Sequence, residues 1–388
     1  MTLEFKAKVG LVCMPQVKSL WLMVPAEFAA FRQKLIRWYG KTARDLPWRR
    51  TRDAYQIWIS EIMLQQTTVA AVVPYFERFL KSFPTVFELA AADENAVLRH
   101  WEGLGYYSRA RNIHKTAKII VDQYQGRFPE DVEALLSLPG IGRYTAGAIA
   151  SFAFDQPAPI VEANTLRLYC RLLGYDKDPR SKEGQAELWA FATAILPRKS
   201  PGQINQALME LGASHCGPVA PECDACPVHQ HCRANREGTQ AAIPLPKAKI
   251  ELTDVTEVSI AVRDRNRYLL RRRTTDERWA GLWDFVRFEI PHGTRSIDFP
   301  NILNSVSERT GLTIELGPQV AEWKHGVTRY RITLKCFTAD RLDGRLAGEQ
   351  EWKWVKPNEF SEFPLSVTAR KFAKKLQKPA DELPNLFS

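Results

Sequence analysis

The feature that most constrains this chain is a group of four cysteines in one short segment, Cys216-x6-Cys223-x2-Cys226-x5-Cys232. Four soft sulfur ligands in so short a loop suit a tetrahedral metal ion or an iron–sulfur cluster. Zinc sites usually place two ligands on each side of a longer spacer, so zinc is the less favoured interpretation and disulfides are less favoured still. The segment is therefore predicted to hold a metal centre.

Length and composition indicate a globular protein with a polyanionic partner. The chain has 388 residues, enough for two or three domains, and a formal net charge of +10 that favours binding to nucleic acid. The remaining cysteines, Cys13, Cys170 and Cys336, are too scattered for a disulfide framework, which indicates a reducing compartment. No apolar run is long enough to predict a membrane span. Residues 1–24 lack a clean signal-peptide pattern and are interpreted as an extension or a mis-set start codon.

The residue pattern divides the chain into a helical part and a strand-rich part. From about Glu27 to Arg236, apolar residues recur at intervals of three and four, which predicts helices. The small, prolyl and basic residues 238–254 are typical of a linker. Beyond it, strands are expected over 255–263, 268–273, 320–323 and 330–337, and helices over 302–309 and 364–376. The fold class is thus a mainly α core followed by an α+β domain.

A second motif lies at Leu138-Pro-Gly-Ile-Gly-Arg-Tyr-Thr-Ala-Gly-Ala148. A helix should end before Pro139, and Gly140 and Gly142 permit a tight turn whose backbone amides stay accessible. A second helix should begin at Arg143. Amides at a helix N-terminus bind phosphate well, so the motif is the helix–hairpin–helix signature of a sequence-independent grip on the DNA backbone. An ordinary connection between two helices is the alternative.

Together these motifs resemble the MutY-type adenine DNA glycosylases of the endonuclease III-like helix–hairpin–helix superfamily. Supporting segments are Leu46-Pro-Trp-Arg49, Trp58-Ile-Ser-Glu-Ile-Met-Leu-Gln-Gln-Thr67, Gly103-Leu-Gly-Tyr-Tyr-Ser-Arg-Ala-Arg111 and Asn205-Gln-Ala-Leu-Met-Glu-Leu-Gly212. The resemblance implies a [4Fe–4S] cluster on Cys216, Cys223, Cys226 and Cys232. It also implies a six-helix domain with the hairpin over 46–157, a cluster domain over 25–45 and 158–237, a Nudix-like lesion-recognition domain over 255–376 and a tail over 377–388.

The resemblance implies that Glu61 is the catalytic acid. Its segment is strongly apolar, so the carboxyl should be partly buried with a raised pKa, which suits a general acid at neutral pH. In this family the equivalent residue protonates the adenine at N7. Tyr144 stands where lyase-competent relatives carry a Schiff-base lysine, which implies a monofunctional glycosylase. A surface glutamate and a packing aromatic are the structural alternatives for these two residues.

The second catalytic carboxylate departs from the family pattern. The usual hydrophobic-Asp-Gly-Asn becomes Val161-Glu-Ala-Asn164, with Glu162 in place of Asp and Ala163 in place of Gly. Glu162 keeps the negative charge that would stabilise a cationic sugar. Its additional methylene moves the carboxylate outward by about one ångström. Glu162 and Asn164 are still the predicted partners at the sugar.

Further residues are predicted by resemblance to contact DNA. Gln65, Gln66 and Thr67 correspond to the loop at the lesion pair, with Gln66 inserted beside the abnormal guanine. Tyr106 corresponds to the aromatic wedge that replaces lost stacking when the base is extruded, although a core tyrosine is the alternative. Gly140 and Gly142 would grip phosphate. The roles of Arg109 and Arg111 are left open between phosphate contacts and solvated charges.

The C-terminal part resembles a Nudix domain that binds without hydrolysing. The segment 269–285 resembles its strand–loop–strand, and Gly281 within it is predicted to contact the DNA or the lesion, while 302–311 keeps only Glu308 of the acidic metal box. Family members read 8-oxoguanine with a Phe-Ser-His triplet. Here Val327, Thr328 and Arg329 take those positions, with Thr328 keeping a hydroxyl and Arg329 able to donate to the lesion or to grip phosphate. Generic polar residues at a strand edge are the alternative.

The expected function is hydrolytic release of adenine from A:8-oxoguanine or A:G pairs in double-stranded DNA. The enzyme would act as a monomer, without a membrane, in a bacterial-type cytoplasm and in association with the nucleoid. Three rivals remain: a mismatch glycosylase for another base, a lesion-binding sensor with little turnover, and a redox protein that uses the cluster for electron transfer.

Overall fold

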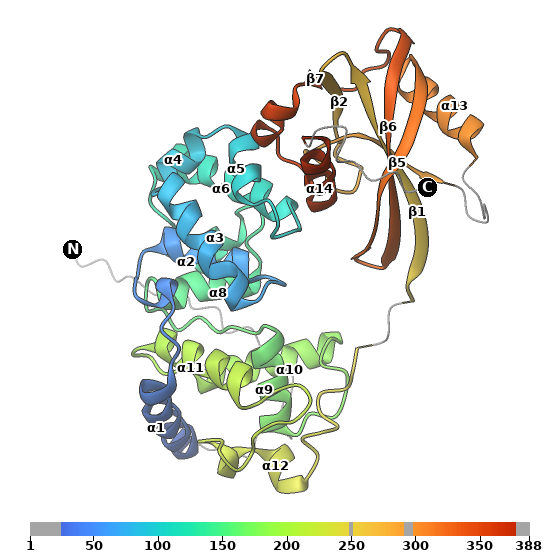
Figure 1. The fold of residues 1–388 in the computed structure, drawn as a ribbon. Coiled ribbons are helices and arrows are strands. Elements are labelled where there is room, and N and C mark those ends of the chain that lie inside the picture. Colours follow the sequence, from blue (N-terminus) through green and yellow to red (C-terminus); the bar gives the residue numbers. More distant parts are fainter. Residues whose placement is uncertain (1–24, 248–250, 291–297, 378–388) are drawn as a thin grey trace. The chain divides into compact units, whose positions relative to one another are not determined.

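The computed structural model describes residues 25–247, 251–290 and 298–377, and these form two compact units (Figure 1). The first unit contains residues 25–61 and 128–247. The second contains residues 62–127 and the described residues from 251 onward. Each unit therefore joins segments that are far apart in the sequence.

The first unit is helical, as predicted. Its elements are α1 (Pro25–Thr42), η1 (Pro47–Arg49), most of α2 (Ala54–Leu64), α7 (Val132–Leu136), α8 (Arg143–Phe152), α9 (Ala163–Leu173), α10 (Lys182–Ile195), α11 (Pro201–Ser214), η2 (His229–His231) and α12 (Arg233–Glu237). A core that includes Phe31, Leu35, Tyr169, Phe191 and Leu208 packs α1 against α9, α10 and α11. Burial of these apolar side chains is the main force that holds the helices together.

The N-terminal half of the second unit contains four helices: α3 (Val69–Ser82), α4 (Val86–Ala91), α5 (Glu94–His100) and α6 (Ser108–Tyr124). Thr85 and Glu88 form a capping box at the start of α4, and Asp93 caps α5. α4 and α5 both pack against α6. The loop before α3 carries Gln66, and the loop between α5 and α6 carries Tyr106.

The C-terminal half of the second unit is an α+β fold. Its strands are β1 (Thr253–Asp264), β2 (Arg267–Arg272), β3 (Trp283–Asp284), β4 (Val286–Ile290), β5 (Leu312–Val327), β6 (Tyr330–Gly344) and β7 (Trp352–Val355). The sheet order is β3-β2-β1-β6-β5, with β4 pairing to β1 and β7 to β2. The β1–β6 pair is parallel and the other pairs are antiparallel.

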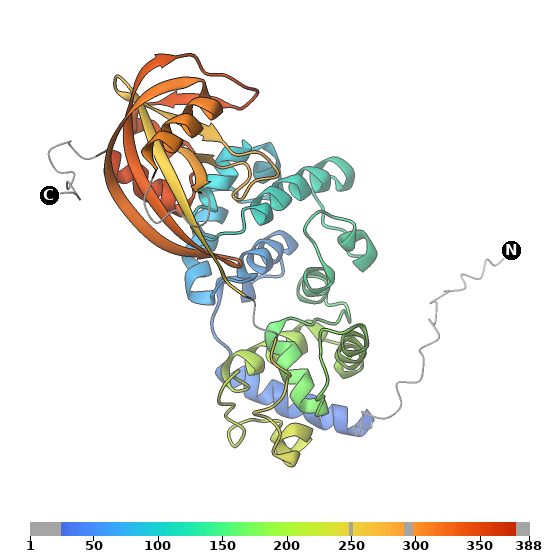
Figure 2. The ribbon, with the colours of Figure 1, turned by 90° about the vertical axis from the view of Figure 1, so that its right-hand side faces the viewer.

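A helix covers each face of this sheet. α13 (Phe299–Thr310) packs on one face and α14 (Val367–Leu376) on the other, so the sheet has an apolar core on both sides (Figures 1 and 2). The predicted mainly α core with a C-terminal α+β domain is confirmed. Within the described parts of the chain, none of the helices combines the length and the apolar character that a membrane span requires.

The expected secondary structure was wrong in detail at the C-terminal domain. β5 and β6 extend well beyond the predicted 320–323 and 330–337, because their antiparallel pairing continues from Val327 and Tyr330 at the turn to Leu312 and Gly344. The helix expected from residue 364 begins at Val367. Leu365 instead forms a bridge with Trp283, and the preceding Pro357–Glu362 is the separate 3-10 helix η3.

Candidate active site and DNA interface

The Glu61 carboxyl lies in the apolar helix α2 and is only 3% exposed. Burial raises the pKa of Glu61 to about 7, a hydrogen bond from Tyr144 opposes that rise, and the charge of Glu162 adds to it. The expectation of a buried carboxyl with a raised pKa is therefore confirmed. At neutral pH such a group is present in both protonation states, so it can donate a proton and later accept one.

Tyr144 reaches Glu61 from the first turn of α8. Its hydroxyl donates to Oε2 of Glu61 at 2.5 Å and lies 3.9 Å from the sulfur of Met209. Burial, followed by the charges of Glu61 and Glu162, raises the pKa of Tyr144 well above its ordinary value. The phenol therefore stays protonated and acts as a hydrogen-bond donor to Glu61.

Glu162 is the N-cap of α9. Its two carboxylate oxygens accept hydrogen bonds from the backbone N–H groups of Asn164 and Thr165, each at 2.9 Å, and the backbone N–H of Glu162 donates to the Thr165 hydroxyl at 2.8 Å. The longer side chain is thus folded back onto the end of its own helix, where the partial positive charge favours an anion. Burial nevertheless raises the pKa of Glu162, against these amide bonds and the charge of Arg167.

Asn164 connects Glu162 with the cysteine segment through an arginine. Its amide donates to Glu162 Oε2 at 3.3 Å, and its side-chain oxygen accepts from Arg167 at 3.0 Å. Arg167 also donates to the carbonyls of Gly212 and Cys216, at 2.6 and 2.8 Å. A Cβ at Gly212 would lie 2.8 Å from the Asn164 carbonyl oxygen, so glycine permits this close contact of α9 and α11.

The four predicted cysteine ligands line one small cavity. Arg171 on α9 lines the cavity, and its guanidinium donates to the sulfur of Cys216 at 3.3 Å and to the carbonyl of Gly217 at 2.7 Å. Among the described residues, no three His, Cys, Asp or Glu side chains are grouped closely enough to hold a single metal ion. His215, Glu222 and His229 also line this cavity, and the four thiols supply the donor set that fits a cluster whose iron atoms each take one thiolate.

The helix–hairpin–helix turn has the predicted form. α7 ends at Leu136, Gly140 has a φ of +78° and Gly142 is the N-cap of α8. Gly142 offers no side chain to the first amides of α8, and a Cβ there would meet open space. The backbone N–H groups at this helix start are accessible to an anion.

The predicted DNA-contacting loops of the second unit are exposed and have unusual backbone geometry. Gln66 has a φ of +58° and Tyr106, 52% exposed, has a φ of +48°. Residues with side chains rarely adopt this left-handed region, and such positions cluster at functional sites. Gln65 and Thr67 flank Gln66 and are half-buried.

The structure corrects both interpretations of Arg109, the first of the two arginines after Tyr106. Arg109 is buried and its guanidinium is surrounded by backbone carbonyls, so in this structure it is neither a solvated charge nor placed at the surface for phosphate. Arg111 is half-buried and donates to the carbonyl of Ala280, in the loop that contains Gly281. Gly281 has a φ of +81°.

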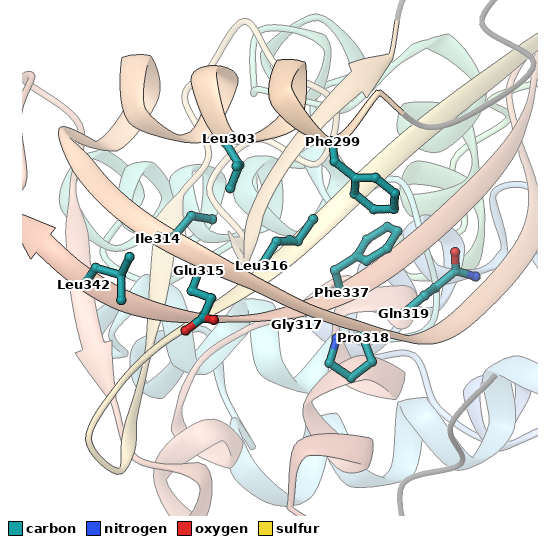
Figure 3. A pocket seen from close by; sticks show the side chains of 10 residues that line it. All are labelled: Phe299, Leu303, Ile314, Glu315, Leu316, Gly317, Pro318, Gln319, Phe337 and Leu342. Atoms are coloured by element: carbon teal, nitrogen blue, oxygen red, sulfur yellow. The ribbon is translucent and has the colours of Figure 1, made fainter. Parts of the chain in front are cut away.

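In the C-terminal domain, Thr328 and Arg329 form the tip of the β5–β6 hairpin. Thr328 has a φ of +54° and is exposed, and Arg329 donates to the hydroxyl of Tyr330 at 3.0 Å. A groove of this domain lies elsewhere, between α13 and strands β5 and β6, with Phe299, Leu316 and Phe337 in its wall (Figure 3). No predicted site residue lines it.

Sequence reasoning left the role of Arg109 open and did not single out Arg167, although both arginines organise these sites. Both lie close after a recognised motif residue, Tyr106 and Asn164. Arginines near the first turn of a helix are unfavourable for the helix dipole, which is the signal that could have marked them.

Comparisons with known proteins agree with this architecture. Residues 59–193 match the HhH-GPD superfamily of base excision DNA repair proteins, and residues 258–375 match the NUDIX domain. The chain is 39% identical over 260 residues to the adenine DNA glycosylase of Buchnera aphidicola subsp. Acyrthosiphon pisum, covering 67% of this chain and 74% of that protein. It is 44% identical over 231 residues to the Rattus norvegicus adenine DNA glycosylase, covering 56% of this chain and 45% of that protein.

A solved structure of a thermostable thymine-DNA glycosylase is also similar. It is 28% identical with a TM-score of 0.50, and the match covers 54% of this chain and 97% of that one.

Proposed function

Because the chain belongs to the adenine DNA glycosylase family, a family of base-excision-repair enzymes that act on DNA, we propose that it hydrolyses the N-glycosidic bond of adenine paired with 8-oxoguanine or guanine. The observation that carries the proposal is the buried Glu61–Tyr144 pair with Glu162 nearby. It supplies an acid that is half-protonated near neutral pH and a second carboxylate, which is what glycosidic cleavage requires.

In the proposed reaction Glu61 acts first as an acid. It donates its proton to N7 of the extruded adenine, and the C1′–N9 bond breaks with its electron pair passing to the base. The deoxyribose becomes an oxocarbenium-like cation. Tyr144 holds the Glu61 carboxyl in one orientation throughout, and its hydrogen bond stabilises the carboxylate that forms.

Glu162 then stabilises the cationic sugar. A water molecule adds to C1′ and gives up its proton to the Glu61 carboxylate, which leaves an abasic sugar and restores the acid. The Asn164–Arg167 contacts keep the Glu162 carboxylate oriented. Since Tyr144 has no amine, it cannot form a Schiff base with C1′, and the proposed enzyme releases the base without cutting the strand.

Different parts of the protein would bind the DNA backbone and recognise the lesion. Accessible amides at the start of α8 would bind a backbone phosphate, Gln66 and Tyr106 would enter the duplex, and Thr328 with Arg329 would meet the 8-oxoguanine. The net charge of +10 favours this polyanionic partner. We place the enzyme as a monomer with the nucleoid in a bacterial cytoplasm.

The resident cofactor in this proposal is a [4Fe–4S] cluster on Cys216, Cys223, Cys226 and Cys232, which share one cavity. When bound, it cross-links a loop that has little regular structure of its own, and it takes no part in the hydrolysis. Arg171 would donate to the Cys216 sulfur. Four irons per chain and the absorption of an iron–sulfur cluster are expected in purified protein, and fewer than one iron per chain would contradict this assignment.

The test of the proposed activity is single-turnover cleavage of a duplex with one central A:8-oxoguanine pair, beside duplexes with A:G, T:G and A:T pairs. We expect adenine release from A:8-oxoguanine and A:G, none from A:T, and no strand cut before alkali. Glu61→Gln should reduce the rate on the order of 1,000-fold without weakening binding, because it cannot supply the proton. Glu77→Gln, an exposed carboxyl on α3, is the matched control.

Other outcomes would identify the rivals. Tight binding of the A:8-oxoguanine duplex without base release, by cluster-loaded protein, would contradict the enzyme and support a sensor. Release of thymine from T:G in place of adenine would indicate a different base specificity.

A further inference from the structure

Arg109 is a buried cation at the second residue of α6, held among backbone oxygens. It is 8% exposed, and its pKa is lowered to about 10 by burial, so the guanidinium stays charged at neutral pH. Its hydrogen-bond acceptors are neutral: the carbonyls of Ile62, Met63, Gln65, Leu104 and Gly105 and the hydroxyl of Thr67.

The two terminal nitrogens of the Arg109 guanidinium, Nη1 and Nη2, together contact two loops. Nη1 donates to Ile62, Met63 and Gln65, at 2.8, 3.1 and 2.6 Å. Two of these are carbonyls in the last turn of α2, which have no partner inside the helix and lie at its negative end. Nη2 donates to Leu104 and Gly105, both at 3.1 Å, on the other loop, and to the hydroxyl of Thr67 at 3.4 Å on the first loop.

Each loop carries one exposed side chain on a left-handed backbone. Gln66 follows directly after the carbonyl of Gln65, and Tyr106 follows directly after that of Gly105. Trp101 donates a further bond to the Gly105 carbonyl at 3.2 Å, and the guanidinium lies 5.7 Å from the Tyr106 ring centre. A residue with a side chain keeps a left-handed backbone only where several surrounding contacts hold it there. Arg109 supplies such contacts next to both Gln66 and Tyr106.

We propose that Arg109 is a positioning residue that ties the Gln65–Thr67 loop to the Gly103–Tyr106 loop, so that Gln66 and Tyr106 are fixed relative to one another before DNA arrives. The consequence for base extrusion rests on the proposed function. Because both side chains must enter the duplex together, a fixed spacing removes the conformational cost of ordering them at the moment of binding.

The first experiment is hydrogen exchange on the full chain without DNA. Arg109→Met should raise exchange in both loops together, on the order of tenfold or more, while the centres of α3 and α9 keep wild-type protection. Arg109→Lys keeps the charge but has too few donors for both loops, so at least one loop should still exchange faster. Arg127→Met, which removes an exposed arginine after α6, should change neither loop. Unchanged exchange in either loop of Arg109→Met would overturn the proposal.

The second experiment separates positioning from general damage and from phosphate binding. Arg109→Met should lose on the order of 10- to 100-fold in excision from a fully paired A:8-oxoguanine duplex. Most of that loss should be recovered when the flanking pairs are mismatched and the adenine is already unstacked. An equal loss on both substrates would contradict positioning. The salt dependence of DNA binding should keep its slope, whereas a direct phosphate contact would reduce the slope by about one.

These two experiments also show separately whether the proposed glycosylase activity fails or the proposed positioning role of Arg109 fails. If wild-type protein releases no adenine, the proposed function fails, and the exchange result still decides whether Arg109 links the loops.

Discussion

Two regions differ in how the structure prepares their residues for function. One is the buried site of the first unit that contains Glu61, Tyr144 and Glu162, called the pocket below, and the other is the pair of loops in the second unit that Arg109 links. Glu61 is 3% exposed and Tyr106 is 52% exposed. Burial changes the chemistry of Glu61, because a desolvated carboxyl holds its proton to neutral pH. Exposure leaves Tyr106 free to meet a ligand, and the unusual element there is the backbone, which is left-handed.

This difference shows that the two regions lose stability for different reasons. In the pocket the cost is electrostatic, since two carboxyls with raised pKa values lie near each other. In the loops the cost is conformational, and a buried arginine with neutral acceptors compensates for it. Changes in the pocket should therefore depend on pH, and changes at the loop tips should not.

The largest expected effect is on stability in the pocket. The pKa of Glu61 is about 7 in the folded protein and ordinarily 4.5, so the ionised group destabilises the fold. That penalty is absent below about pH 4.5, grows up to about pH 7 and is constant above. Glu61→Gln should raise the free energy of unfolding by about 3 kcal/mol at pH 8 and by almost nothing at pH 4.5. Denaturant unfolding at both pH values measures this, and a pH-independent difference would contradict it.

The next prediction concerns Tyr106, where the excision rate should change and the free energy of unfolding should not. Tyr106→Ala should reduce the excision rate roughly 30-fold, because stacking of an aromatic ring on a base contributes about 2 kcal/mol. The free energy of unfolding should change by less than about 1 kcal/mol at any pH, since the ring is half in solvent. Tyr106→Phe is the matched control and should keep both properties. A large loss of stability in Tyr106→Ala would show that the ring belongs to the core.

The smallest effect concerns the hydrogen bond inside the pocket. Tyr144→Phe removes a donor that lowers the pKa of Glu61, so this pKa should rise further, by about one unit. The reaction needs protonated Glu61 for its first step, and the alkaline limb of the single-turnover rate should move to higher pH by that amount. A shift toward lower pH would show that Tyr144 does not stabilise the carboxylate.

Several parts of the fold and site could be predicted from local patterns. The apolar residues around Glu61 predict its burial, and the Pro139–Gly142 turn predicts where α7 ends and α8 begins. These depend on residues close together in the chain, for which spacing and backbone preference are enough. The two-residue strand β3 and the polar C-terminal part of β6 were not predictable, because so short or so polar a stretch gives no strand signal until it pairs with a neighbouring strand.

The sequence by itself determined the chemical groups: four thiols in one loop, an acid in an apolar helix, and a tyrosine in place of a lysine. Only the tertiary structure decided that Tyr144 meets Glu61, 83 residues away, and that Arg109 joins two loops about 40 residues apart. The physical reason is that residue type sets what a side chain can donate or accept, whereas burial and long-range contacts decide which partner it meets.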